Sequence, residues 1–168
     1  IQKVAFSRLK KADGTKNSFT TGSSTGIDKL AAWTAKMAKT DGEKVVISPY
    51  IQAPSAEPGD PITFGGGNDT LGGVEIVIGR NATPFTGVMR SVPQSVIKAM
   101  KALQCEAQAD NLGVFLFDEN GAIAAIEDGT TAGTYYPIPI RSLFISDKGF
   151  GGLETPDSNN IQCAFPPN

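Results

Sequence analysis

Histidine is absent from this chain of 168 residues, and that absence removes several classes of functional site. Imidazole is the base of Ser-His-Asp and Cys-His nucleophiles, the usual proton shuttle near neutral pH and a common ligand of transition metals. None of those sites can be built from this sequence. We therefore predict neither a histidine-dependent enzyme nor a histidine-ligated metal centre.

Cysteine is scarce and long apolar runs are missing. The two cysteines, Cys105 and Cys163, form neither the framework of a disulfide-rich domain nor a zinc-ligand spacing. We expect both to be buried free thiols, with a bridge between them as the alternative. No uninterrupted apolar stretch approaches the length of a transmembrane helix, so the sequence predicts no membrane-spanning segment.

Charge of either sign is modest but unevenly distributed. The formal net charge of −2 argues against bulk attraction to nucleic acid or to an anionic membrane. Residues 1–44 carry nine Lys and Arg against four Asp and Glu, whereas the remainder carries six against thirteen. We interpret the basic end as a solvated arm; the alternatives are docking on an acidic face of a neighbouring copy and contact with nucleic acid.

Glycine and proline are abundant, with 19 and 11 residues, and this favours many turns and short strands over long helices. The length fits one domain. Residues 1–26 end in a tract of polar and small side chains, and we predict a flexible basic arm there. Residues 27–168 are then a single α+β domain, which may be a fragment of a longer chain.

Two amphipathic helices are predicted from helical spacing of apolar residues. Thr25 would cap the first helix, which Asp41-Gly42 ends. Ser91 would cap the second helix, with Pro93 in its first turn. The apolar face of the first helix comprises Ile27, Leu30, Ala31, Thr34, Met37 and Ala38, and that of the second comprises Val92, Val96, Ala99, Met100 and Leu103.

The strands are predicted to be short and numerous, and the fold class to be α+β, mainly antiparallel, as a sandwich or partial barrel with the two helices packed on it. Asn120-Gly121 indicates a two-residue hairpin turn, and the apolar run Val114–Phe117 indicates burial on both faces. Residues 51–73 read as a long structureless loop, which is usually functional or disordered. The predicted strands are residues 44–50, 74–79, 85–89, 112–117, 122–126, 135–146 and 161–165.

Candidate catalytic patterns are weak. Ser95 and Lys98 match S-x-x-K in a predicted helix, but the accompanying K-T-G strand is missing. Gly22–Gly26 matches G-x-S-x-G without a preceding apolar strand or a histidine base. We interpret the first pair as helix surface and the second motif as a linker, and we assign no catalytic residue.

Candidate ligand-binding patterns are equally weak. The glycine-rich residues 65–73 contain no phosphate-loop motif and lead into a strand, where a phosphate loop leads into a helix. Asp118–Gly121 resembles the start of a calcium loop, but its glycine comes too early, so a hairpin turn explains it better. Asn68 and Asn81 begin glycosylation sequons that we attribute to chance. We predict no cofactor and no metal site.

The order of segments over residues 60–168 resembles structural proteins of tailed bacteriophages that infect Bacteroidetes-type hosts. In outline it is similar to tail tube and tail ring subunits, in which a β-sandwich flanked by a helix carries long inter-subunit loops. No diagnostic motif is present, so no residue roles are transferred. The segments that carry the resemblance are GGGNDTLGG, FTGVMRSVPQSVIKAMKALQC, FLFDENGAIAAI and PIPIRSLFISDKGFGGLETPDSNNIQCAFPP.

This resemblance implies a non-enzymatic, self-assembling subunit of a phage particle, with a tail position favoured. Its partners would be copies of itself and other particle proteins, and its location would be the virion after synthesis in the host cytoplasm. One alternative is a cell-surface module that binds carbohydrate or protein through Tyr135, Tyr136 and Trp33. The other is a small hydrolase that uses Ser95 and Lys98.

Overall fold

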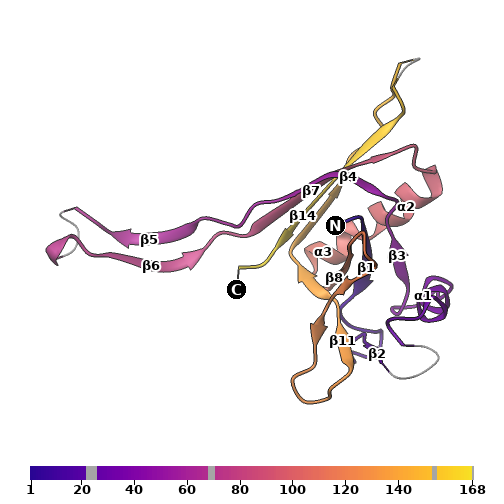
Figure 1. Cartoon of the computed structure of the whole chain (residues 1–168), viewed down its shortest axis with the longest axis horizontal. Helices are drawn as coiled ribbons and strands as arrows, with labels where there is room; N and C mark the ends of the chain where they lie inside the picture. Colours follow the sequence, from indigo (N-terminus) through magenta and orange to yellow (C-terminus); the bar gives the residue numbers. More distant parts are fainter. Residues whose placement is uncertain (22–25, 68–70, 153–154, 168) are drawn as a thin grey trace.

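The computed structural model describes residues 1–21, 26–67, 71–152 and 155–167 (Figure 1). Two antiparallel sheets organise most of this chain. The first has the strand order β12-β8-β1-β3, and a short strand β9 also pairs with β8. Its strands are β1 (Lys3–Arg8), β3 (Val45–Ile47), β8 (Leu112–Phe117), β9 (Ile123–Ala124) and β12 (Ile138–Ile140).

The second sheet has the order β13-β14-β7-β4 and contains the longest strands. A smaller sheet, β10-β11-β2, and a two-stranded ribbon, β5-β6, complete the β structure of the described residues. The bounds are β4 (Ile51–Ala56), β7 (Thr83–Arg90), β13 (Ser142–Ile145), β14 (Ser158–Phe165), β2 (Phe19–Thr20), β10 (Ile126–Glu127), β11 (Thr134–Tyr136), β5 (Pro61–Gly65) and β6 (Glu75–Arg80).

The helices are α1 (Leu30–Met37) and α2 (Gln94–Ala102), which the short α3 (Gln104–Gln108) follows directly. A 3-10 turn spans Leu71–Gly73. The predicted class, α+β with mainly antiparallel sheets and few helices, is therefore confirmed. No helix among the described residues is long and apolar enough to cross a membrane.

The larger core lies between the two main sheets and is closed by α2. Each sheet contributes one face of its strands, because alternate side chains of a strand point to opposite faces. Ile97 and Met100 of α2 are fully buried against these strands. The strand residues of this core include Val4, Phe6, Val114 and Ile140 from the first sheet and Phe85, Met89, Ile145, Ile161 and Cys163 from the second.

A second, smaller core covers the opposite face of the first sheet. Phe19 stacks on Trp33 with ring centroids 4.4 Å apart, and Phe115 meets both rings edge-on at 5.2 and 5.3 Å. Such edge-to-face contacts add stability beyond the area they bury. Since Val114 lies in one core and Phe115 in the other, β8 is buried on both faces at these positions, as the sequence predicts.

The predicted flexible arm over residues 1–26 is wrong for its first part. Strand β1 lies in the middle of the first sheet, with β8 on one side and β3 on the other. Val4, Ala5 and Phe6 are at most 1% exposed. The lysines from which a solvated arm is predicted flank a short apolar strand. That strand lies between two partner strands, so its apolar residues are buried.

Both helices differ from prediction in their caps, and the first also differs in its buried face. Helix α1 buries Ala32 and Trp33, while Leu30 is 79% exposed. The large indole anchors the helix, and its Nε1–H donates to the backbone oxygen of Ile27 at 2.7 Å. The N-cap of α1 is Lys29 and not the predicted Thr25, which lies outside the described residues. The N-cap of α2 is Pro93 and not the predicted Ser91, which has a φ of 51° two residues earlier.

The predicted hairpin after β8 forms, but its turn is longer than two residues. Phe117 pairs with Ile123, so residues 118–122 make the loop. The Asp118 carboxylate accepts hydrogen bonds from the backbone N–H of Asn120 at 2.9 Å and of Ala122 at 2.7 Å. Gly121 takes a φ of 82°. The side chain of Asp118 therefore organises the turn. The prediction uses Asn120-Gly121 alone and so does not include this side chain.

Candidate functional site

A β-hairpin projects from the second sheet where the sequence predicts a structureless loop (Figure 1). Strands β4 and β7 pair at the sheet edge, and the chain continues beyond them as the β5-β6 ribbon. We call residues 57–67 and 71–80 the hairpin arm. The prediction of a structureless loop over residues 51–73 is therefore wrong where β4 (Ile51–Ala56) and β5 (Pro61–Gly65) form strands.

Glycine and local hydrogen bonds fix the base of the hairpin arm. The N–H of Gly59 donates to the hydroxyl of Thr83 at 3.3 Å, and the N–H of Asn81 donates to the backbone oxygen of Asp60 at 2.9 Å. A side chain on Gly59 would overlap the backbone oxygen of Asn81. The two strands thus approach closely at a position where only glycine fits.

One face of the hairpin arm is apolar and solvent-exposed. Phe64 pairs with Ile76, and alternation along β5 places Ile62 on the same face as Phe64. Ile78 lies two residues after Ile76, at a register shift where Ile62 pairs with Gly79 and Ile78 itself has no partner in the ladder. Their residue exposures are 57% for Phe64, 51% for Ile76, 42% for Ile62 and 65% for Ile78. The opposite face carries Thr63 and its partner Val77. Val77 is also 65% exposed, so both faces of the ribbon expose apolar side chains, and the face of Phe64 carries more of them.

The charges of the hairpin arm are mainly acidic. Glu57, Asp60 and Glu75 are exposed, and Arg80 is the basic residue at the end of β6. In the described part of the chain, none of these four side chains forms an ion pair. A partner surface with cationic groups would therefore meet acidic groups that are still available.

A mainly apolar groove of about 530 Å³ lies where the hairpin arm leaves the body. We call it the base groove. Arg80 and Thr83 form one side, and the start of β10 with the ends of β8, β12 and β14 supplies the rest. Ile126 at its border is 45% exposed. Its apolar lining includes Leu116, Ile126, Ile138, Phe165 and Pro166.

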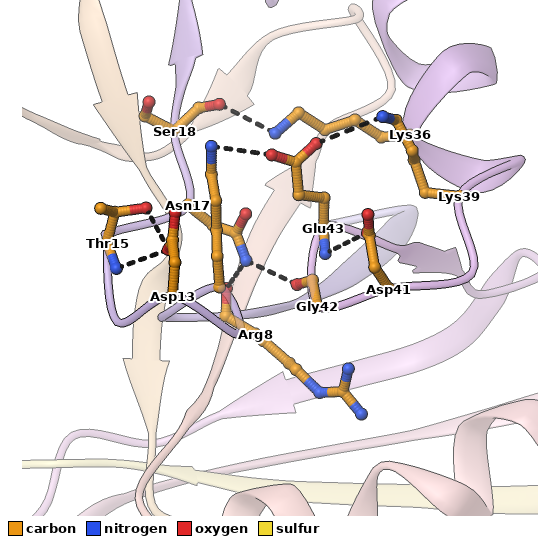
Figure 2. Close-up of polar contacts among 11 residues, drawn as sticks. Arg8, Asp13, Thr15, Asn17, Ser18, Lys36, Lys39, Asp41, Gly42 and Glu43 are labelled. Atoms are coloured by element: carbon orange, nitrogen blue, oxygen red, sulfur yellow. Dashed lines mark hydrogen bonds and ion pairs between the residues drawn. The ribbon is translucent and has the colours of Figure 1, made fainter.

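A polar cluster joins the start of β3 to the segment between β1 and β2 (Figure 2). Buried Asn17 donates from Nδ2 to the backbone oxygens of Arg8 at 2.9 Å and Gly42 at 2.7 Å. Lys11 Nζ lies 2.7 Å from Glu43 Oε1, and their hydrogen bond lowers the pKa of the Glu43 carboxyl and raises the pKa of Lys11. We interpret this cluster as a clamp between chain segments.

Lys36 belongs to the same cluster but is partly buried. Its Nζ donates to the backbone oxygen of Ser18 at 2.9 Å and lies 4.5 Å from the ring centroid of Phe19. Burial lowers the pKa of Lys36, because desolvation disfavours the charged form. Both contacts tie α1 to β2, so the position of this lysine is explained by packing.

The predicted Ser95–Lys98 pair lies on an exposed surface of α2. A lysine that acts as a base for serine needs burial to lower its pKa, and Lys98 is exposed. Gly22–Gly26 falls largely outside the described residues, and so does the sequon at Asn68. Asn81 of the second sequon is exposed between β6 and β7.

Trp33, Tyr135 and Tyr136 do not form the exposed aromatic platform proposed from the sequence. Trp33 is 5% exposed and belongs to the smaller core, with its N–H already bonded. Tyr135 also packs against that core, and Tyr136 lies 5.1 Å beneath the ammonium of Lys16. The three side chains therefore serve mainly to support the fold.

The cysteines are both free, but only Cys163 is buried as predicted. Burial raises the pKa of its thiol to about 12. Cys105 is exposed on α3, which corrects the expectation for that residue. Among the described residues, no group of three or more acidic or cysteine side chains could hold a metal ion.

Sequence reasoning missed the hairpin arm's apolar face and the base groove. Residues 74–79 are correctly predicted as a strand, but for their partner β5 the sequence predicts a loop. The available signal was the apolar alternation of Ile62 and Phe64, followed by a glycine-rich turn and a second apolar strand. The base groove gives no such signal, because distant segments assemble it.

Comparisons of the chain with protein-family models, with curated proteins and with solved structures find no match. The exposed apolar face of the hairpin arm and the mainly apolar base groove are therefore the features from which a function can be inferred.

Proposed function

We propose that this protein is a non-enzymatic structural subunit that assembles with copies of itself through the hairpin arm. The particle is a tailed bacteriophage, with a tail component as the position that the resemblance over residues 60–168 favours. The virion is then its location and other particle proteins are its further partners. In that role the two facing sheets act as a sandwich that holds the hairpin arm in a fixed direction.

The exposed apolar face of the hairpin arm is the observation that carries the proposal. Side chains of this size contribute about 1.5–3 kcal/mol each when fully buried. An isolated two-stranded ribbon is marginally stable in water, and a packed face is what stabilises it. Exposed patches of this kind mark interaction sites in soluble proteins. Contact with another protein surface would bury this face and fix the ribbon.

The two other readings of the sequence receive less support. A sugar-binding platform requires exposed aromatic rings, and Trp33 is buried. A Ser-Lys hydrolase requires a desolvated lysine, and Lys98 is exposed. The basic N-terminal end is also no free docking arm, because β1 is a central strand. The hairpin arm is thus the strongest candidate for contacts between copies.

Sedimentation velocity over a range of protein concentrations tests the proposal. We expect the full chain to form oligomers, and the variant with Phe64→Asp and Ile76→Asp to remain monomeric while keeping its thermal transition. Leu30→Asp is the matched control, because Leu30 is an exposed apolar residue on α1. A full chain that stays monomeric up to millimolar concentration would refute self-assembly.

A further inference from the structure

The apolar face of the hairpin arm does not reach the base groove of the same molecule. The ribbon continues the direction of β4 and β7 away from the body (Figure 1). Arg80 and Thr83, where the hairpin arm begins, themselves form one side of the base groove. The apolar face around Phe64 and Ile76 lies farther along the ribbon. An occupant of the base groove must therefore come from another molecule or another segment.

We propose that the apolar face of the hairpin arm of one copy docks in the base groove of a second copy. This inference rests on the proposed function and names the receiving surface of the same contact. Both surfaces are mainly apolar and exposed, and each is present once in every copy. The partner is thus a second copy of this chain, in a head-to-tail arrangement.

The sizes of the two surfaces agree. Grooves of roughly 300–1,000 Å³ accept ligands of several side chains' volume, and the base groove measures about 530 Å³. The four side chains of the apolar face expose on the order of 100 Å² each, which is roughly half of the ~800 Å² that one partner contributes to a standard interface. Backbone and polar rim contacts would supply the remainder.

The charges favour this arrangement over pairing of two hairpin arms. The lining of the base groove, as far as the structure describes it, contains Arg80 and no acidic side chain, so the acidic hairpin arm of a second copy meets no like charge there. Glu75 lies on the face of the ribbon opposite Ile76 and stays outside the groove. Pairing of two arms would instead bring together Glu57, Asp60 and Glu75 of both copies, and like charges in contact are unfavourable.

A contact between two different surfaces has a structural consequence. Each bound copy still presents an unused hairpin arm at one end and an unused base groove at the other. Repetition of such a heterologous contact generates a ring if the rotation closes, and an open helical tube if it does not. Both outcomes fit a subunit of a particle.

Mixing of two defective variants tests the inference. The arm variant carries Phe64→Asp and Ile76→Asp, and the groove variant carries Ile126→Asp. Each alone should show a dissociation constant raised about tenfold or more, since these residues occupy the centre of the contact. An equimolar mixture should form heterodimers that do not grow further, because one intact arm and one intact groove remain.

The outcomes separate the two proposals. Wild-type oligomers, together with heterodimers in the mixture, support the inference. Wild-type oligomers with no heterodimer overturn the docking site but leave self-assembly standing, and an unaffected groove variant does the same. A monomeric wild type overturns the proposed function itself. Leu30→Asp mixed with the arm variant should instead give mixed oligomers that grow beyond dimers, because its base groove and arm are both intact.

Cross-linking covers the case in which Ile126→Asp fails to fold. Copies with Ile76→Cys are mixed with copies that carry Ile126→Cys, and both carry Cys105→Ser because Cys105 is exposed. Oxidation should give a covalent dimer within the mixture, and Leu30→Cys in place of Ile126→Cys should give none. Equal cross-linking from both positions would overturn the proposed docking site.

Discussion

Replacement of Phe115 by alanine should destabilise the protein strongly, because this ring connects the smaller core. Phe115 is 1% exposed in the middle of β8. Its ring meets Phe19 at 5.2 Å and Trp33 at 5.3 Å, both edge-on. Truncation to alanine removes both contacts and leaves a cavity between the first sheet and α1.

The magnitude follows from burial and from these ring contacts. Phe→Ala in a core costs about 3–5 kcal/mol, including the cavity left behind. Edge-to-face aromatic pairs contribute about 0.5–1.5 kcal/mol each beyond their buried area. Two such pairs are lost here, so the loss should reach at least the middle of that range. We expect a loss of about 4 kcal/mol in the free energy of unfolding.

Urea unfolding followed by tryptophan fluorescence measures this loss directly. The chain has a single tryptophan, Trp33, and its indole touches Phe115, so the signal reports on the mutated core. With an m value of about 2 kcal/mol per M, the midpoint should fall by about 2 M. Phe144→Ala is the control, since Phe144 is 54% exposed, and it should cost less than about 1 kcal/mol.

A loss below about 1 kcal/mol for Phe115→Ala, at an unchanged m value, would refute the reasoning. It would mean that β8 is not buried on its second face, and that α1 does not close the smaller core. An equal loss in Phe144→Ala would show instead that the two positions are equally buried.

Three further predictions concern the body of the protein. Deletion of residues 1–8 should abolish cooperative unfolding in calorimetry, because the central strand β1 is removed. Gly87→Val should lower the unfolding free energy by about 1–3 kcal/mol in urea titration, because a Cβ there meets buried Ile51, whereas Gly129→Ala, in open space, should have little effect. A thiol reagent should label Cys105 in the native protein and Cys163 only after unfolding. Because burial raises the pKa of Cys163 to about 12, the folded state binds this proton more tightly than the unfolded state. The contribution of Cys163 to the free energy of unfolding should therefore fall as the pH rises from about 9 to about 12.

Part of this fold is visible in the sequence. Continuous apolarity at Val114–Phe117 predicts a doubly buried strand, because no alternation with polar residues occurs there, and the structure has it. The predicted face of α2 is correct in part, because Met100 is buried but the buried Ile97 is not among the predicted residues. These features depend on neighbouring residues alone, and local patterns therefore suffice.

The rest depends on partners that sequence patterns do not identify. The flanking lysines of β1 suggest solvent, yet pairing with β3 and β8 places its apolar residues in the centre. In α1 the exposed Leu30 and the buried Trp33 reverse the expected face, because one large indole decides which side of a short helix is packed. The base groove combines residues from β6, β7, β8, β10, β12 and β14 or their neighbours, and it becomes apparent only in three dimensions.

The pairing of β1 with β8 also constrains the order of events during synthesis. Residues 3–8 pair with residues 112–117, so strand β1 is synthesised about a hundred residues before this neighbour. Strand β14 then inserts between β7 and β13, and only afterwards do Phe165 and Pro166 complete the base groove. A nascent chain therefore contains all residues of its hairpin arm before it has a finished base groove, so under the proposed docking a new copy could receive a neighbour only after its own second sheet is closed.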